Sequence, residues 1–246
     1  MTRRLLILGG TGEAAALAAR AFDEFGGRLD VISSLAGRVK KPRALPGRVR
    51  VGGFGGGDGL ARYLESEKID LLIDATHPFA ATISANARHA CAQTGTPRLI
   101  LVRPDWPDSA AVEVDDPAAA ARAAQKRGRR AFLSFGQGGL AAFAALPDMA
   151  FVVRVIDEPE TPLPIPHATV ITGRPPFSLA DEKALFEEHA IDVLVSKNSG
   201  GARVPAKITA ALELNIPIIL IARPPVEPGA QAGDIEAALS WVAGRI

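Results

Sequence analysis

This chain of 246 residues has a single cysteine, few aromatic residues and almost no excess of one charge over the other. The single cysteine, Cys91, excludes an internal disulfide and any cysteine-rich zinc site, so we expect a reducing compartment, the cytoplasm. The formal net charge is only +1, which offers no electrostatic footprint for nucleic acid or an anionic membrane. No run approaches the roughly 18 apolar residues of a membrane span. No His, Cys and carboxylate cluster has metal-ligand spacing, so no metal is expected.

Several catalytic motifs are absent as well. The chain has neither G-x-S-x-G nor G-x-x-x-x-G-K-[ST], which excludes serine hydrolases and P-loop NTPases of the usual kinds. Short-chain reductases and sugar-nucleotide epimerases need a Tyr-x-x-x-Lys pair, but the only tyrosine, Tyr63, is followed four residues later by Glu67. What the chain has is 48% hydrophobic and 22% charged residues, the composition of a globular protein.

Short β-type runs alternate with Ala- and Leu-rich helical stretches, and this alternation predicts parallel α/β sheets. In the first half, we predict strands at 4–8, 29–33, 48–52, 70–74 and 97–102, and helices at 13–25, 59–67 and 81–95. In the second half, we predict strands at 131–135, 150–155, 168–172, 192–196 and 217–222, and helices at 178–189, 204–214 and 234–244. The Pro- and Asp-rich segment 103–109 is the predicted boundary between two domains, residues 1–104 and 105–246.

Three pairs of segments indicate that the two halves are similar. The pairs are LLILGGTGEAAALA (5–18) with AFLSFGQGGLAAFA (131–144), IDLLIDATHPFA (69–80) with IDVLVSKNSGGA (191–202), and TPRLILVRP (96–104) with IPIILIARP (216–224). The order is the same and the offsets are 126, 122 and 120 residues, which favours an internal duplication. The alternative is that α/β proteins share such local patterns anyway. We therefore predict two Rossmann-like parallel-sheet domains with a cleft between them.

A glycine-rich loop follows the first predicted strand. Residues 10–15, GTGEAA, fit G-x-G-x-x-A directly between a strand and a helix, which is the context of the dinucleotide fingerprint. Glycines allow close approach of the backbone to a pyrophosphate, and the helix N-terminus supplies N–H donors. An ordinary tight turn is the alternative. Residues 136–141, GQGGLA, repeat the pattern, either as a second anion site or as a relic of duplication.

The end of the second predicted strand favours NADP(H) over NAD(H). An NAD-specific fold places an acidic residue there, but Asp30 is at the wrong end of this strand. Ser33 and Ser34 occupy the right end and Arg38 follows, and these groups suit a ribose 2′-phosphate unless the basic segment is only a solvated loop. The segment 52–57, GGFGGG, allows close backbone approach to a ligand or serves as a connector.

Two predicted strands end in polar residues. Asp74, Thr76 and His77 offer an acceptor, a hydroxyl and a group that titrates near neutrality, at the sheet edge where ligands bind. Pro78 is suited to start a helix, and the alternative is that Asp74 or Thr76 merely caps that helix. The matching donors of the second half, which suit anionic groups, are Lys197, Asn198 and Ser199 before Gly200 and Gly201.

The sequence motifs of this chain, taken together, resemble those of the precorrin-6A reductase family of cobalamin biosynthesis. The resemblance runs through ILGGTGEA, ISSLAGR, GGFGG, DATHPFA, SKNSGG with Lys207 following, and IPIILIARP, and covers nearly the whole chain. One departure is Pro176 in GRPPF, where the family usually has glycine. The resemblance implies NADPH-dependent reduction of a carbon–carbon double bond in precorrin-6A, or its cobalt form, to precorrin-6B. It also implies that the substrate is a polycarboxylate tetrapyrrole.

The motifs that carry the resemblance complete the expected site. The catalytic candidates are His77, Thr76 and Lys197. The expected cofactor-binding residues are Gly9, Gly10, Thr11, Gly12, Glu13, Ser33, Ser34, Arg38, Gly53, Asp74 and Thr76. The expected substrate-binding residues are His77, Pro78, Phe79, Lys197, Asn198, Ser199, Gly200 and Lys207, with Arg103, Arg154 and Arg174 as further cations.

Several alternatives stay open at this point. A non-catalytic NADP(H)-binding sensor is the main competing interpretation, and another NADP-dependent reductase is the second. The proton donor is not identified, since His77, Thr76 and an ordered water are all candidates. The oligomeric state is also open, with a monomer as one option.

Overall fold

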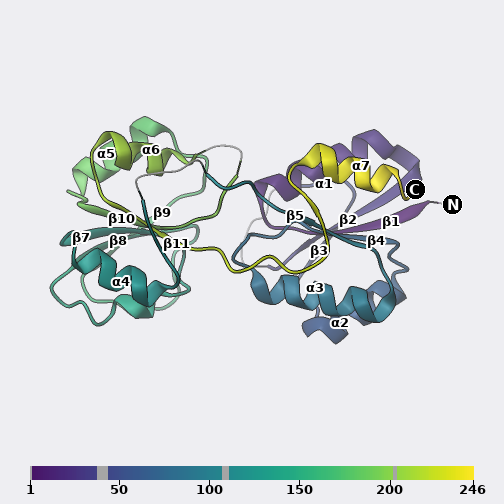
Figure 1. The fold of residues 1–246 in the computed structure, drawn as a ribbon, viewed down its shortest axis with the longest axis horizontal. Helices are drawn as coiled ribbons and strands as arrows, with labels where there is room; N and C mark the ends of the chain where they lie inside the picture. Colours follow the sequence, from purple (N-terminus) through teal and green to yellow (C-terminus); the bar gives the residue numbers. More distant parts are fainter. Residues whose placement is uncertain (1, 38–43, 107–110, 202–203) are drawn as a thin grey trace. The chain divides into compact units, whose positions relative to one another are not determined.

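The structure is a computed structural model that describes residues 2–37, 44–106, 111–201 and 204–246. The chain forms two compact units, each described by itself below. Unit 1 comprises Met1–Pro104 and Pro224–Ile246, and unit 2 comprises Asp105–Arg223. Each unit contains a six-stranded sheet with helices on both faces (Figure 1). The predicted pair of parallel-sheet α/β halves is therefore confirmed. Within the described ranges, none of the helices has the length and apolar character to cross a bilayer.

The sheet of unit 1 has the strand order β12-β5-β4-β1-β2-β3, and all its strands run parallel. Its strands are β1 (Arg3–Leu8), β2 (Leu29–Leu35), β3 (Arg48–Val51), β4 (Leu71–Asp74), β5 (Arg98–Leu101) and β12 (Ala230–Ala232). Its helices are α1 (Gly12–Phe25), α2 (Gly56–Ser66), α3 (Ala81–Thr94) and α7 (Ile235–Ala243), with a 3₁₀ turn, η1 (Gly26–Arg28), after α1.

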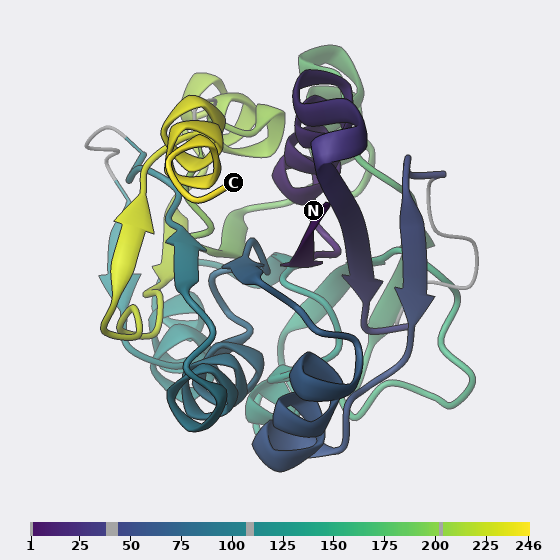
Figure 2. The ribbon, with the colours of Figure 1, turned by 90° about the vertical axis from the view of Figure 1, so that its right-hand side faces the viewer.

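Helices cover both faces of this sheet, which explains its apolar central strands. Helices α1 and α7 lie on one face, and α2 and α3 lie on the other (Figure 2). In β1, Leu5 and Ile7 pack toward α1 and α7, whereas Leu6 and Leu8 pack toward α2 and α3. All four are at most 2% exposed. A strand buried on both faces reads as a continuous apolar run rather than an alternating one, as β1 does.

The sheet of unit 2 has the order β6-β11-β10-β7-β8-β9 and is also parallel throughout. Its strands are β6 (Val112–Val114), β7 (Arg130–Ser134), β8 (Ala150–Val155), β9 (Ala168–Thr172), β10 (Val193–Lys197) and β11 (Ile218–Ile221). Its helices are α4 (Pro117–Gln125), α5 (Leu179–Glu188) and α6 (Ala206–Glu213), with a 3₁₀ helix, η2 (Leu140–Phe143). Helices α5 and α6 pack side by side on the face that carries Phe132.

The last segment of the chain corrects the predicted second domain, 105–246. Strand β12 pairs with β5, with Ala230 opposite Leu99, and so belongs to the sheet of unit 1. Ala238 and Leu239 of α7 lie in the same core cluster as the residues of α1. Residues 224–246 therefore belong to unit 1, and the second unit ends at Arg223. The short strands β6 and β12 and helix α4 were not predicted.

The two sheets correspond strand for strand. Leu8, the last residue of β1, lies opposite Asp74 at the end of β4. Ser134, the last residue of β7, lies opposite Ser196 in β10. The same register and strand order place the loops after β1 and β7, and those after β4 and β10, at equivalent positions in the two units. The internal duplication itself stays a prediction.

The core position of α7 gives a stability prediction. Leu239→Ala, at a side chain that is 2% exposed, should lower the free energy of unfolding of unit 1 by roughly 2–5 kcal/mol, because it leaves a cavity. The chain has two tryptophans, and Trp241 packs against the core of unit 1 while Trp106 packs against that of unit 2. In a Trp106→Phe background, urea unfolding followed by Trp241 fluorescence reports on unit 1.

The matched control is Leu212→Ala on α6, whose side chain is 43% exposed. This change should leave the unit 1 transition where it was. An unchanged transition in the Leu239→Ala variant would contradict the assignment of the C-terminal segment to unit 1.

Candidate functional site

The first glycine loop is hydrogen-bonded to the end of β4. Thr11 is the N-cap of α1, and its hydroxyl oxygen accepts a bond from the Ala14 N–H at 3.0 Å. The same hydroxyl donates to the carbonyl oxygen of Ala75, also at 3.0 Å. The Gly9 N–H donates to the carbonyl oxygen of Ser34 on β2 at 2.9 Å. The loop is therefore fixed to both neighbouring strands, directly beside the residues that follow β4.

Two glycines leave the surface of this loop open. Gly10 has a φ of 105°, a conformation that favours glycine. A Cβ added to Gly10 or Gly12 would meet no atom within 4 Å, so both positions border open space. The first N–H groups of an α-helix have no intrahelical partner, and α1 begins at Gly12. This arrangement suits an anionic group approaching the backbone.

Asp74 is buried beneath the residues that follow β4. It is 2% exposed, and its Oδ1 accepts bonds from the Thr76 hydroxyl at 2.7 Å and the Thr76 N–H at 3.2 Å. Among the described residues, its Oδ2 has no hydrogen-bond partner. Since the Thr76 hydroxyl hydrogen is committed to Asp74, the hydroxyl oxygen can only accept a further bond. Asp74 thus contacts Thr76 and is not exposed at the surface.

The turn after Thr76 fixes the imidazole of His77. The Nδ1 atom of His77 accepts a bond from the Phe79 N–H at 3.2 Å, so a neutral ring in this arrangement carries its hydrogen on Nε2. The rings of His77 and Phe79 lie 5.8 Å apart. Helix α3 begins only at Ala81, with Ala80 as N-cap and no side-chain cap. The expectations that Pro78 starts the helix and that Asp74 or Thr76 caps it are therefore wrong.

The two serines expected to favour NADP(H) are buried. Ser33 and Ser34 are 2% and 6% exposed, within a strand that continues to Leu35. The Ser33 hydroxyl has no partner among the described residues. Neither serine is therefore exposed at the surface. Arg38 lies outside the described residues, so its role stays a prediction.

The glycine-rich segment after β3 is held by Arg50. Its guanidinium donates to the carbonyl oxygen of Gly53 at 2.7 Å and to that of Gly52. It also lies 3.8 Å from the centroid of the Phe54 ring. This segment is therefore an ordered turn rather than a loose connector, with Gly53 at the carboxyl edge of the sheet.

Glu13 and Arg103 were expected in different roles but form an ion pair. The Arg103 guanidinium lies 3.0 Å from a Glu13 carboxylate oxygen, and only 15% of the Arg103 side chain is exposed. Burial lowers the pKa of Arg103, and Glu13 opposes this shift. Both residues sit at the edge that carries the glycine loop, Glu13 in the first turn of α1.

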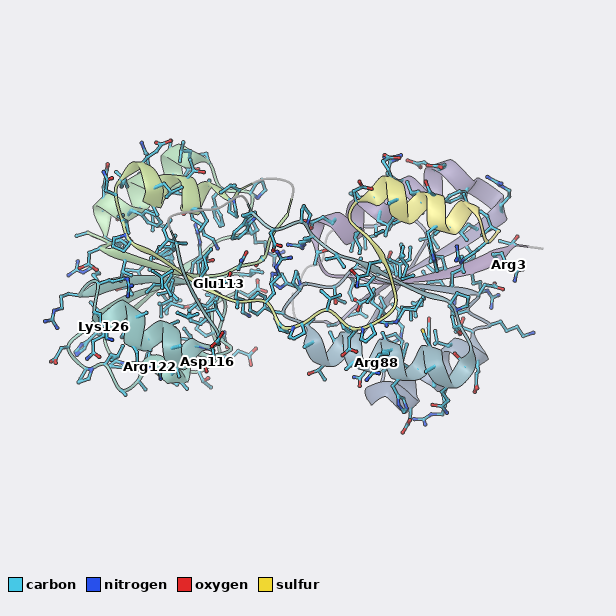
Figure 3. The ribbon with its side chains drawn as sticks, viewed as in Figure 1. Arg3, Arg88, Glu113, Asp116, Arg122 and Lys126 are labelled. Carbon is cyan, nitrogen blue, oxygen red and sulfur yellow. The ribbon has the colours of Figure 1, made fainter. Side chains whose placement is uncertain are left out.

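In unit 2, the residues after β10 form a tight turn. The Ser199 N–H donates to the carbonyl oxygen of Lys197, the last residue of β10, at 2.9 Å. The Asn198 amide donates to a carboxylate oxygen of Glu113 (Figure 3) on β6 at 2.7 Å. Gly200 has a φ of 58°, which favours glycine at that point. The donor-rich end predicted for this strand is thus built as a turn anchored to the edge strand.

Lys207 lies on α6 and reaches the end of β7. Its ammonium group donates to the hydroxyl of Ser134 at 3.0 Å and to the carbonyl oxygen of Ser134 at 3.3 Å. Burial, followed by the positive charge of Arg154, lowers the pKa of Lys207 to about 8, and the carboxylate of Glu182 opposes the shift. A partly buried lysine without a carboxylate in contact is sensitive to any anion that approaches it.

Arg154 is not available as a substrate-binding cation, and this corrects the expectation. One guanidinium nitrogen donates to both carboxylate oxygens of Glu182, at 2.7 and 3.0 Å, and the two side chains are 8% and 2% exposed. The guanidinium also lies 3.9 Å from the centroid of the Phe177 ring. Arg174 pairs with Asp157 at 2.9 Å. Arg154 therefore serves the packing of unit 2.

Residues that the sequence did not single out also shape these edges. They are Arg50, Ser134, Glu182 and Glu113. Ser134, Glu182 and Glu113 each contact a partner distant in sequence, as Ser134 does with Lys207, whereas Arg50 contacts the neighbouring Gly52 and Gly53. Only Arg50 carried a local signal, because it precedes a glycine-rich segment at the end of a predicted strand.

Comparisons with known proteins agree over almost the full length. The family model described as Precorrin-6x reductase CbiJ/CobK matches residues 4–243. The precorrin-6A reductase of Rhodococcus erythropolis is 48% identical over 243 residues, which cover 97% of both chains. That of Mycobacterium tuberculosis (strain CDC 1551 / Oshkosh) is 46% identical over 244 residues, covering 98% of both. A solved structure described as CobK precorrin-6A reductase has a TM-score of 0.91 and 41% sequence identity, and covers 100% of this chain and 97% of its own.

Proposed function

The chain belongs to the precorrin-6x reductase family, and from this premise we propose that it reduces a carbon–carbon double bond of precorrin-6A with NADPH. Because of this family membership, it is a reductase of cobalamin biosynthesis. The observation that carries the finer proposal is the hydrogen bond from the Thr11 hydroxyl to the Ala75 carbonyl oxygen. It joins the glycine loop, suited to a dinucleotide, to the segment that carries Thr76 and His77.

The residues of unit 1 fit a nicotinamide dinucleotide. Gly10 and Gly12 border open space at the start of α1, where a pyrophosphate finds backbone N–H donors and the positive end of a 14-residue helix. Gly9, Thr11 and Glu13 shape this loop through contacts with Ser34, Ala75 and Arg103. Gly53 and Arg38 follow β3 and β2 in sequence, which supports a role near the ribose, with Arg38 as the predicted partner of a 2′-phosphate.

Bound NADPH supplies a hydride to one carbon of the double bond, and the neighbouring carbon takes up a proton. The chain contributes position and polarity. Asp74 holds the Thr76 hydroxyl so that its oxygen presents an acceptor. The Phe79 N–H holds His77 with its hydrogen on Nε2, as a hydrogen-bond donor. A proton lost from this neutral ring would leave an imidazolate, so we assign the proton to water and orientation of the substrate to His77.

The substrate is a polycarboxylate, and we propose that donors at the carboxyl edges of the strands bind its acid groups. In unit 1 these are His77 with Pro78 and Phe79 beside it. In unit 2 they are the residues of the turn after β10 together with the cation on α6, namely Lys197, Asn198, Ser199, Gly200 and Lys207. Charge-assisted bonds from lysine to carboxylate are the strongest contacts such a site can offer.

A sensor that binds NADP(H) without catalysis would share unit 1 but needs no donors for a polycarboxylate in unit 2. The membership of a reductase family favours the enzyme. A cytoplasmic location stays a prediction.

The cofactor assignment predicts a loss of NADPH binding when a side chain fills the glycine loop. Gly12→Val should weaken NADPH binding by about a hundredfold, because the added side chain occupies the space open to a pyrophosphate. Titration of NADPH fluorescence measures this. Arg38→Ala should weaken NADPH but leave NADH unchanged, and the wild-type protein should bind NADPH more tightly than NADH.

Gly27→Val is the matched control, since a Cβ there also meets nothing within 4 Å but Gly27 lies at the opposite end of α1. With wild-type protein, NADPH absorbance at 340 nm should fall one for one with precorrin-6A consumed. Equal binding of NADH, or no turnover with precorrin-6A or its cobalt form, contradicts the proposal.

Asp74 is a positioning residue, and a double-mutant cycle tests its action through Thr76. Asp74→Ala and Thr76→Val should each lower kcat by roughly tenfold to a hundredfold. The double variant should be no slower than the slower single variant, because both changes remove one arrangement. Asp74→Asn keeps an acceptor for Thr76 and should recover most of kcat. Additive losses would show that Asp74 acts independently of Thr76.

A further inference from the structure

The second glycine loop has no role in the function proposed above, although it follows β7 as the first follows β1. Gly136 and Gly139 have φ values of 76° and 98°, so both need the freedom of glycine. A Cβ added to Gly136 or Gly138 would meet no atom within 4 Å, as at Gly10 and Gly12. The loop follows β7 as the first follows β1, and it leaves open space at the carboxyl edge of its sheet.

The strand residue that precedes this loop differs in chemistry from the equivalent residue of unit 1. Leu8, the last residue of β1, is a buried apolar side chain in the core cluster beneath α2 and α3. Ser134 takes the equivalent place in β7, and its hydroxyl and carbonyl oxygen accept bonds from Lys207. An apolar position of unit 1 is therefore replaced in unit 2 by a polar one with a cation beside it.

The charge around Lys207 is unbalanced. Among the residues that the structure describes, the charged groups that act on Lys207 are Arg154 on β8 and Glu182 on α5. Both oxygens of the Glu182 carboxylate already accept bonds from Arg154. Among the described residues, the ammonium group of Lys207 bonds only to neutral oxygens of Ser134. Two cations with one carboxylate leave an excess positive charge beside the loop, and such a charge is costly unless an anion joins it.

We propose that Ser134, the loop Gly136–Gly139 and Lys207 form a carboxylate-binding site in unit 2. The proposal rests on the proposed function, because it assigns one acid group of the polycarboxylate substrate to this site. A carboxylate there would accept backbone N–H bonds from the loop and a charge-assisted bond from Lys207, which has a third N–H besides the two bonds to Ser134.

The phosphates of a dinucleotide have the same anionic chemistry, but the element after the loop favours a carboxylate. In unit 1 the loop leads into α1, a helix of 14 residues whose dipole suits a pyrophosphate. In unit 2 it leads into η2, a 3₁₀ helix of only four residues. A lysine thus supplies the charge that a long helix supplies in unit 1, and one lysine matches a single carboxylate.

The test compares two ligands in wild type and two variants. Gly138 has no positive φ and open space around its Cβ, so Gly138→Val is compatible with the fold but fills the site. Lys207→Met removes the cation. With NADP⁺ present to prevent turnover, each variant should weaken binding of precorrin-6A about tenfold or more, while the Kd of NADPH stays within about twofold.

The pH dependence gives an independent readout. Lys207 is charged below its lowered pKa of about 8, so precorrin-6A affinity should fall as the pH rises from 7 to 9. Lys207→Arg, which keeps its charge throughout, should bind with little change over this range. Lys126→Met is the control, because this exposed lysine ends α4, away from the carboxyl edge (Figure 3), and it should alter neither affinity.

The outcomes separate this site from the cofactor site. Unchanged precorrin-6A affinity in Gly138→Val overturns the proposal, with Trp106 fluorescence on urea unfolding showing that unit 2 is folded. Weaker NADPH binding in Gly138→Val overturns the carboxylate assignment in favour of a phosphate. If Gly12→Val leaves NADPH binding intact while Gly138→Val weakens precorrin-6A, the cofactor assignment fails and the carboxylate site stands.

Discussion

Parallel pairing of every strand is the constraint on which both candidate sites depend. In a wholly parallel sheet, all carboxyl ends lie at one edge, so residues far apart in sequence meet there. The hydrogen bond between Thr11 and Ala75 spans 64 positions of the chain. That between Lys207 and Ser134 spans 73. Apolar side chains such as Leu5 and Phe132 pack between each sheet and its helices, and this packing holds the carboxyl edges in place.

The two units use one framework for different chemistry. The end of β1 in unit 1 is apolar at Leu8, and the carboxylate of Asp74 lies opposite it on β4. In unit 2 the equivalent pair is Ser134 and Ser196, and the charge nearby is the cation of Lys207. In unit 1, the N-terminus of a long helix suits the phosphates of a cofactor, and a carboxylate suits its hydroxyl groups. A cationic edge suits the acid groups of the substrate.

The sequence predicted the features that are local and missed those that depend on distant partners. Apolar runs and glycine loops identified both parallel sheets and the residues at their carboxyl edges. The strands β6 and β12 have three residues each, which is too short for a hydrophobic periodicity to mark them. Arg154 on β8 is bonded to Glu182 on α5, 28 residues away. From the sequence alone this arginine was therefore interpreted as a cation available to the substrate. The alternative cap at Asp74 failed because the turn after Thr76 delays the helix to Ala81.

We propose that the glycine loop after β1 binds a dinucleotide and that the loop after β7 does not. The most direct measurement is the number of NADP⁺ molecules bound per chain, by isothermal titration calorimetry of the full protein without substrate. We expect one, because the loop before α1 leads into a helix of 14 residues, whereas the loop after β7 leads into a 3₁₀ helix of four. Two equivalent NADP⁺ molecules per chain would contradict it.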